Sequence, residues 1–250
     1  MTKNSKGTFY GVGVGPGDPE LLTLKAFRLI QQAVVISYLS NTEGSSQAKT
    51  IARSALADAV SPALEIPILM HMSNDRRLAN QAYDQGARAI QEQLNAGQDV
   101  VFLCEGDPLF FGSFAYLLER LEDNYCCQVV PGISSVNAAA SSLVEPLTLL
   151  KESFAVVSGR HSDEQILDTL QTHDAVVIMK AGRARPRILK LLEDCDRTKD
   201  ARYLEYIGRE QEHIEKNVSN LANEAGPYFS LFVVLPNNRH RADSGEQGGE

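Results

Sequence analysis

The sequence has little from which to build a disulfide framework, a zinc site or a membrane span. Its four cysteines form no C-x-x-C pair, so their spacing favours neither disulfides nor a bound metal. No apolar run approaches the roughly 18 residues that a membrane span needs. The first residues, MTKNSKGTFYGVGV, lack the apolar core and cleavage site of a secretory signal. We therefore expect a reduced, cytoplasmic protein without a metal ion or a membrane partner.

Positive charge is also in short supply. The formal net charge of −8 argues against nucleic acid as a partner, because a polyanion needs a basic surface. A small anionic substrate requires only a local excess of positive charge. The densest basic cluster, KAGRARPR, contains Lys180, Arg183, Arg185 and Arg187. This cluster is either a solvated helix start or an anion-binding segment. The adjacent residues Arg76 and Arg77, elsewhere in the chain, are a second candidate for binding an anion.

Apolar, β-rich runs alternate with helical patterns along the chain. This alternation predicts an α/β protein with mostly parallel sheets covered by helices. We expect strands at 8–14, 34–39, 100–104, 127–130, 154–158, 175–179, 201–207 and 228–235. We expect helices at 20–32, 45–59, 75–96, 113–122, 134–143, 164–171 and 184–193.

The strands could form one sheet of eight, but a break near residues 123–133 favours two halves. We therefore predict an N-terminal α/β domain over residues 7–124 and a C-terminal α/β domain over residues 125–236. Residues 1–6 and 237–250 are polar and have no large apolar residue to anchor them, so we expect both ends to be disordered.

The opening segment GVGVGPGDPELL places glycine at four alternate positions before a helix. The nicotinamide fingerprint needs G-x-G-x-x-G, and a Walker A loop ends in Gly-Lys-Ser/Thr. Neither spacing is present, which argues against both phosphate-binding loops. The segment does predict a tight strand-to-helix turn in which Asp18 caps a helix and Pro19 occupies its first position. Gly15 and Gly17 would allow a positive φ or a close backbone approach.

A second strand-to-helix turn of this kind is predicted in VVFLCEGDPLFFGSF, where a strand ends in Gly106-Asp107-Pro108. A third corner, Pro131-Gly132-Ile133-Ser134-Ser135, also follows a strand and precedes a helix of small residues. Ligands of α/β proteins bind at the carboxyl ends of the strands. Three such corners in succession therefore predict a binding site at that edge.

These segments resemble the tetrapyrrole methylases, a family of S-adenosylmethionine-dependent enzymes. GVGVGPGDPELLTLKA is similar to the family's first motif and CEGDPLFFGSF to its second. The second motif has the form found in the subgroup that methylates the C-20 meso carbon of precorrin-2. VVPGISSVNAAAS and AVVIMKAGR fit the same subgroup. The resemblance extends from about residue 7 to residue 236.

The resemblance implies two α/β domains with S-adenosylmethionine bound in the cleft between them, and a homodimer. It also implies a tetrapyrrole substrate that carries eight carboxylates, which gives the basic cluster a role. The implied cofactor contacts are Pro16, Glu105, Gly106, Asp107, Phe110, Ser134, Ser135, Met179 and Gly208. Several of these have a purely structural alternative: Met179 and Phe110 as core residues, Glu105 as a cap or ion-pair partner, Ser134 and Ser135 as helix caps.

The catalytic residues are not identified by the sequence. Some members of the family place an aspartate after the tyrosine that ends their second strand, where this chain has Leu39 after Tyr38. The candidates for a proton acceptor are therefore Glu105, Asp107 and Tyr38. The alternatives in function are the cobalt form of the same substrate, another tetrapyrrole position, and a non-catalytic module that binds S-adenosylmethionine. A nicotinamide-dependent oxidoreductase does not fit the glycine spacing.

Overall fold

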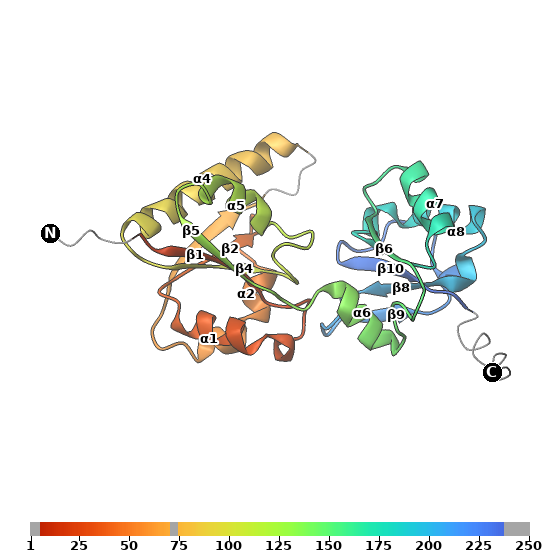
Figure 1. Cartoon of the computed structure of the whole chain (residues 1–250), viewed down its shortest axis with the longest axis horizontal. Coiled ribbons are helices and arrows are strands. Elements are labelled where there is room, and N and C mark those ends of the chain that lie inside the picture. Colours follow the sequence, from red (N-terminus) through yellow and green to blue (C-terminus); the bar gives the residue numbers. More distant parts are fainter. Residues whose placement is uncertain (1–5, 71–74, 238–250) are drawn as a thin grey trace, which may run out of the picture. The chain divides into compact units, whose positions relative to one another are not determined.

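The computed structural model describes residues 6–70 and 75–237. The chain divides between Ser135 and Val136 into two compact units, each of which contains one sheet. Figure 1 shows the elements of each unit. The ends expected to be disordered lie outside the described residues, except Lys6, which donates a hydrogen bond to the carbonyl of Asn124 (3.2 Å), and the exposed Asn237.

The first unit contains a fully parallel sheet with the strand order β3-β2-β4-β1-β5. All five carboxyl ends therefore lie at one edge of the sheet. The strands are β1 (Thr8–Gly13), β2 (Val35–Ser40), β3 (Leu64–Leu69), β4 (Val100–Cys104) and β5 (Cys126–Val130). The helices are η1 (Pro19–Leu21), α1 (Leu24–Gln32), α2 (Gln47–Ile51), α3 (Arg53–Ala57), α4 (Arg76–Asn95) and α5 (Phe114–Leu121).

Helices cover both faces of the first sheet. Helices α1, α2 and α3 pack on one face and α4 and α5 on the other, as Figure 1 shows for the labelled helices. Phe114 of α5 stacks on Phe9 of β1 at 5.2 Å between ring centroids. A Cβ at Gly11 would lie 2.5 Å from the Phe114 ring. The first glycine of the opening segment therefore makes room for an aromatic core residue.

The second unit contains a mixed sheet with the strand order β6-β7-β10-β8-β9. β10 runs antiparallel to β7 and β8, while β6 and β7 are parallel. The carboxyl ends of β6, β7 and β8 therefore share one edge. The strands are β6 (Phe154–Ser158), β7 (Ala175–Met179), β8 (Ala201–Glu205), β9 (His213–Glu215) and β10 (Ser230–Val234).

Helices also cover both faces of the second sheet. Helices α7 and α8 pack on one face and α6 on the other. Successive residues of β7 alternate between the two cores, which is the period of two that a strand requires. The helices are α6 (Ser135–Leu143), α7 (Asp163–Thr172) and α8 (Arg185–Asp194), with short 3-10 turns η2 (Gly182–Ala184), η3 (Thr198–Asp200) and η4 (Val218–Asn220).

The structure differs from the sequence-based expectation in the boundary between the two units, in two additional strands and in the strand directions of the second sheet. β5 pairs with β1, so the two units divide after Ser135 rather than at residues 124/125; as separate domains they remain a prediction. β3 and β9 were not expected, because β3 contains a proline and β9 has only three residues. The second sheet is not mostly parallel, because β10 pairs antiparallel with both of its neighbours.

Helix α6 ends in a left-handed residue that is not glycine. The N–H of Val144 donates to the carbonyl of Ser141 and the N–H of Glu145 to that of Ala140, which is a Schellman ending. Val144 has φ +56°, although a β-branched residue strongly disfavours this region. Its side chain is 88% exposed, so no packing compensates for the strain.

We expect Val144→Gly to stabilise the protein by about 0.5–1 kcal/mol, because glycine adopts φ > 0 without a steric cost. The urea midpoint at constant m-value measures the change. Ser141→Gly, on the same helix but in right-handed backbone, is the control and should destabilise by about 0.5 kcal/mol. An unchanged or lower midpoint for Val144→Gly would contradict the left-handed assignment.

Candidate functional site

Both sheets turn through left-handed backbone at the edge where their strands end. In the first unit Gly15 (φ +83°) and Gly106 (φ +64°) follow β1 and β4 by two residues. In the second unit Lys180 (φ +55°) and Tyr206 (φ +52°) directly follow β7 and β8. Strained non-glycine residues tend to gather at functional sites. The carboxyl edge of each sheet is therefore a candidate site.

The three glycine corners of the first unit meet at this edge. Gly106 and Gly15 form an antiparallel bridge, with N···O distances of 2.8 and 3.4 Å. A Cβ at Gly132 would lie 2.0 Å from the carbonyl oxygen of Gly106, and one at Gly13 would lie 2.6 Å from the Cα of Gly132. These backbones touch where no side chain fits. The three corners lie at the carboxyl edge of the sheet, as the sequence predicted, and ligand binding there stays a prediction.

Two aspartates cap these corners in the same way. Asp18 Oδ1 accepts from the N–H of Glu20 (2.8 Å) and Asp107 Oδ1 from the N–H of Leu109 (2.9 Å). Pro19 opens η1 behind the Asp18 cap, as the sequence predicted. Asp107 makes a second bond that Asp18 lacks in the described structure: Oδ2 accepts from the N–H of Gly132 (3.1 Å). The Asp107 carboxylate thus joins the corner after β4 to the corner after β5.

Apolar side chains border the junction. Phe110 is 36% exposed and its ring lies 5.3 Å from that of Phe111, edge to face. Ile133 is also partly exposed, whereas Pro16 and Ser134 are buried. The predicted contacts Pro16, Glu105, Gly106, Asp107, Phe110, Ser134 and Ser135 all lie in the three corners of this one unit.

Tyr38 belongs to a polar network that the sequence did not indicate. Its hydroxyl donates to Glu65 of β3, and Lys49 of α2 donates to the same carboxylate oxygen (2.6 Å). Burial and the bond to Glu65 raise the pKa of Tyr38. Lys49 and Tyr38 lower the pKa of Glu65, and Glu65 raises that of Lys49. A protonated, donating Tyr38 is a poor proton acceptor at neutral pH. The network was missed because strand β3 was missed.

The second unit brings its two predicted cofactor residues to one edge. Met179 ends β7, where it pairs with Ser158 and Leu231. Gly208 follows β8 in a left-handed conformation, and its N–H donates to Glu212 Oε2 (2.6 Å). The guanidinium of Arg209 stacks on the Phe229 ring at 3.9 Å. Met179 is also partly buried against the core of α6, so its structural role is real.

Two arginines of the basic cluster form hydrogen bonds and ion pairs within the second unit. Arg185 is 7% exposed; it donates to the carbonyl of Glu224 (2.7 Å) and pairs with Glu205 (3.4 Å). Arg187 donates to the carbonyls of Gly159 (2.6 Å) and His161 (3.0 Å) and pairs with Asp163. Both guanidinium groups therefore have partners within the second unit, and their role as substrate contacts stays a prediction.

Lys180 and Arg183 are the other two members of the cluster. Lys180 occupies the left-handed turn after β7 and Arg183 is exposed on η2. The alternative pair lies at the start of α4, where Arg77 pairs with Asp75 (3.0 Å) and Arg76 is exposed.

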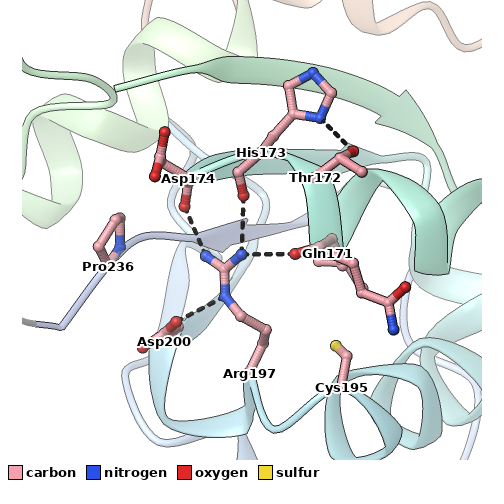
Figure 2. Close-up of a pocket in the computed structure, with 9 residues that line it drawn as sticks. Gln171, Thr172, His173, Asp174, Cys195, Arg197, Asp200 and Pro236 are labelled. Atoms are coloured by element: carbon pink, nitrogen blue, oxygen red, sulfur yellow. Dashed lines mark hydrogen bonds and ion pairs between the residues drawn. The ribbon is translucent and has the colours of Figure 1, made fainter. Parts of the chain in front are cut away.

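A hollow of about 410 Å³ lies in the second unit, at the end of α7 and near the start of β7. Figure 2 shows the Arg197 guanidinium at its centre. Arg197 donates to the carbonyls of Leu170 (2.8 Å), His173 (3.0 Å) and Asp174 (2.6 Å) and pairs with Asp200 (2.7 Å). These bonds satisfy the carbonyls at a helix carboxyl end, so the arginine acts as a structural cap.

Residues 6–70 and 75–237 lack two further features. No group of three histidine, cysteine, aspartate or glutamate side chains there is placed to hold a metal ion. None of the helices in these residues has the length and apolar character required to cross a bilayer.

We expect Glu65→Gln to lower stability by about 0.5–1 kcal/mol at pH 7, a small value because Lys49 and Glu65 are about 40% exposed. The pKa of Glu65 is depressed below its ordinary 4.5, so its contribution is present above that pH and is lost as pH falls through the folded value. Urea unfolding at pH 7 and pH 3 should show the difference shrink in acid. The exposed Glu92→Gln is the control; a pH-independent deficit would contradict the assignment.

We expect Gly132→Ala to destabilise by about 2–3 kcal/mol, because the new methyl group would overlap the Gly106 carbonyl. Gly44→Ala is a matched control: Gly44 is left-handed (φ +82°) but has open space around its Cβ position, so only backbone strain of about 1 kcal/mol applies. Thermal and urea unfolding give both values. Equal losses would show that the junction can open without cost.

The model of the family Tetrapyrrole (Corrin/Porphyrin) Methylases matches residues 8–222. The precorrin-2 C(20)-methyltransferase of Sinorhizobium sp. is 33% identical over 233 residues, which cover 91% of this chain and 95% of that protein. The cobalamin biosynthesis protein CobIJ of Mycobacterium tuberculosis (strain H37Rv) is 33% identical over 244 residues, 96% of this chain; the chain spans only 48% of that protein's length.

A solved structure matches the fold. The uroporphyrin-III C-methyl transferase of Thermus thermophilus, crystallised with S-adenyl homocysteine, aligns with a TM-score of 0.66 and 26% identity. The alignment covers 92% of this chain and 97% of the other. Together with the family match over most of the chain, these comparisons confirm the resemblance inferred from the three corners: the chain belongs to the tetrapyrrole methylase family.

Proposed function

We propose that this chain is an S-adenosylmethionine-dependent methyltransferase that methylates the C-20 meso carbon of precorrin-2 in cobalamin biosynthesis. The observation that carries the substrate is the match with the Sinorhizobium enzyme along nearly the full length of both chains. The methyl donor is supported by the Thermus thermophilus neighbour crystallised with S-adenyl homocysteine. The same activity on cobalt-precorrin-2 is the alternative to test.

The cofactor contacts proposed for this chain are those of the strand-end corners in each unit. They are Pro16, Glu105, Gly106, Asp107, Phe110, Ser134, Ser135, Met179 and Gly208. The residues present suit the group: the partly exposed Phe110 offers a face for an adenine, and left-handed glycines leave backbone groups accessible. The sulfonium supplies a methyl group that an electron-rich carbon can attack directly.

The chain's own residues would act mainly by orientation. Holding the substrate carbon in line with the methyl group provides proximity catalysis. A strong anion beside the sulfur would stabilise the charged ground state that the reaction consumes. The Asp107 carboxylate accepts from two backbone N–H groups, and Tyr38 is a hydrogen-bond donor with a raised pKa. Glu105, Asp107, Tyr38 and water remain the candidates for the acceptor of the proton lost from carbon.

Substrate carboxylates would be bound by the basic cluster Lys180, Arg183, Arg185 and Arg187. Within it, Arg183 is exposed on η2 and Lys180 lies at the turn after β7. We also propose a homodimer, which follows from the family resemblance. A cytoplasmic location is proposed from the four cysteines, all of which are free thiols in the structure.

The proposal is tested by anaerobic incubation of the protein with precorrin-2 and S-adenosylmethionine carrying a ¹³C methyl group. We expect one methyl group in the product by mass spectrometry and ¹³C NMR, placed on the meso carbon between rings A and D. Arg183→Gln should raise the KM for the tetrapyrrole while leaving S-adenosyl homocysteine affinity unchanged.

Each other outcome corrects a different part of the proposal. Label on another carbon would retain methyl transfer and replace the position. Transfer to cobalt-precorrin-2 alone would replace the substrate by its cobalt form. Cofactor binding without transfer to either ring would indicate a non-catalytic module.

A further inference from the structure

We propose that Asp107 is a positioning residue, which holds the corner after β5 in the shape that binds the cofactor. The inference rests on the proposed function. It replaces the direct cofactor contact given for Asp107 above by an action through the backbone at Gly132, and it differs from a catalytic role, in which the carboxylate would touch the transferred methyl group or take a proton. It also differs from an ordinary turn cap, because one of its two bonds leaves the local turn.

The geometry carries this assignment. Asp107 Oδ1 accepts from the N–H of Leu109, two residues on, at 2.9 Å. Oδ2 accepts from the N–H of Gly132 at 3.1 Å, across 25 residues of sequence. Both oxygens of one rigid carboxylate are thus engaged, one in its own corner and one in the next. Ser134, a proposed cofactor contact, is two residues beyond Gly132 and is buried.

An independent observation shows that the corner after β5 is packed directly against the corner after β4. The backbone at Gly132 is so close to that of Gly106 that a Cβ would lie 2.0 Å from the Gly106 oxygen. Contact at this distance fixes how near the two corners come, but a glycine backbone can still rotate or slide. The Asp107 bond to the Gly132 N–H adds direction, since a hydrogen bond weakens steeply away from linearity.

The substitution Asp107→Asn affects the two hydrogen bonds differently. The carbonyl oxygen of the new side chain can still accept from the Leu109 N–H, so the local turn is kept. Its amide group is a donor and would face the Gly132 N–H, another donor. Asp107→Asn therefore breaks the bond between corners with almost no change in volume.

The chain offers a matched control in the other Gly-Asp-Pro corner. Asp18 accepts from the N–H of Glu20 at 2.8 Å in the same local turn. No second acceptor bond of its carboxylate is found in the described residues. Asp18→Asn preserves the one bond that Asp18 makes, so it controls for loss of charge at a capped corner.

The experiment measures S-adenosyl homocysteine affinity by titration calorimetry, and steady-state kinetics with S-adenosylmethionine, for the wild type and both variants. We expect Asp107→Asn to raise the Kd and the cofactor KM about tenfold, the scale of one charge-assisted hydrogen bond. At saturating cofactor its kcat should remain within about threefold of the wild type, because bound cofactor restores the corner. Asp18→Asn should change each value by less than about threefold.

The other outcomes overturn the assignment in distinct ways. A fall in kcat with unchanged KM would make Asp107 catalytic. A lower melting temperature with unchanged Kd would make it merely structural. A wild type that fails to bind S-adenosyl homocysteine would overturn the proposed function and this inference with it. In the wild type alone, the Gly132 amide should be protected from hydrogen exchange without cofactor; rapid exchange would show that the bond is absent.

Discussion

No side chain fits where the backbones of Gly13, Gly106 and Gly132 meet, and the candidate site of the first unit is built around that constraint. β1 lies between β4 and β5 in the sheet, so the turns that leave these three strands must pass one another in a narrow space. Glycine lets them do so at backbone contact distance. The partly exposed residues beside the junction are therefore held by backbone contacts that form without a ligand.

Much of this could be predicted from the sequence because its signals are local. A glycine pair with Asp-Pro after an apolar run indicates a capped turn, and both Asp18 and Asp107 form the expected bond to the residue two places on. Strand and helix alternation gave the α/β class. The purpose of the glycines was only partly visible: Gly11 accommodates Phe114, a residue about a hundred positions away, and no local pattern encodes that contact.

The rest depends on partners that are distant in sequence. Arg185 and Arg187 stand in an arginine-rich segment that suggests an anion site, but their acceptors come from elsewhere in the chain, including Glu205 and Gly159. A composition count registers the cations and not their acceptors. Strand β3 was missed for a similar reason, since its proline lies in an edge strand, where a missing N–H is tolerated. Register and pairing are tertiary properties.

The two units fix their loops by different means. The first unit uses backbone contact and the carboxylates of Asp18 and Asp107; the second uses arginines that donate to loop carbonyls, as Arg187 and Arg197 do. Arginine stays charged throughout the range in which proteins fold, so these bonds persist, and a buried guanidinium that lost its partners would be costly. The loop geometry of the second unit therefore depends on permanent side-chain charges, whereas that of the first unit depends mainly on backbone contact.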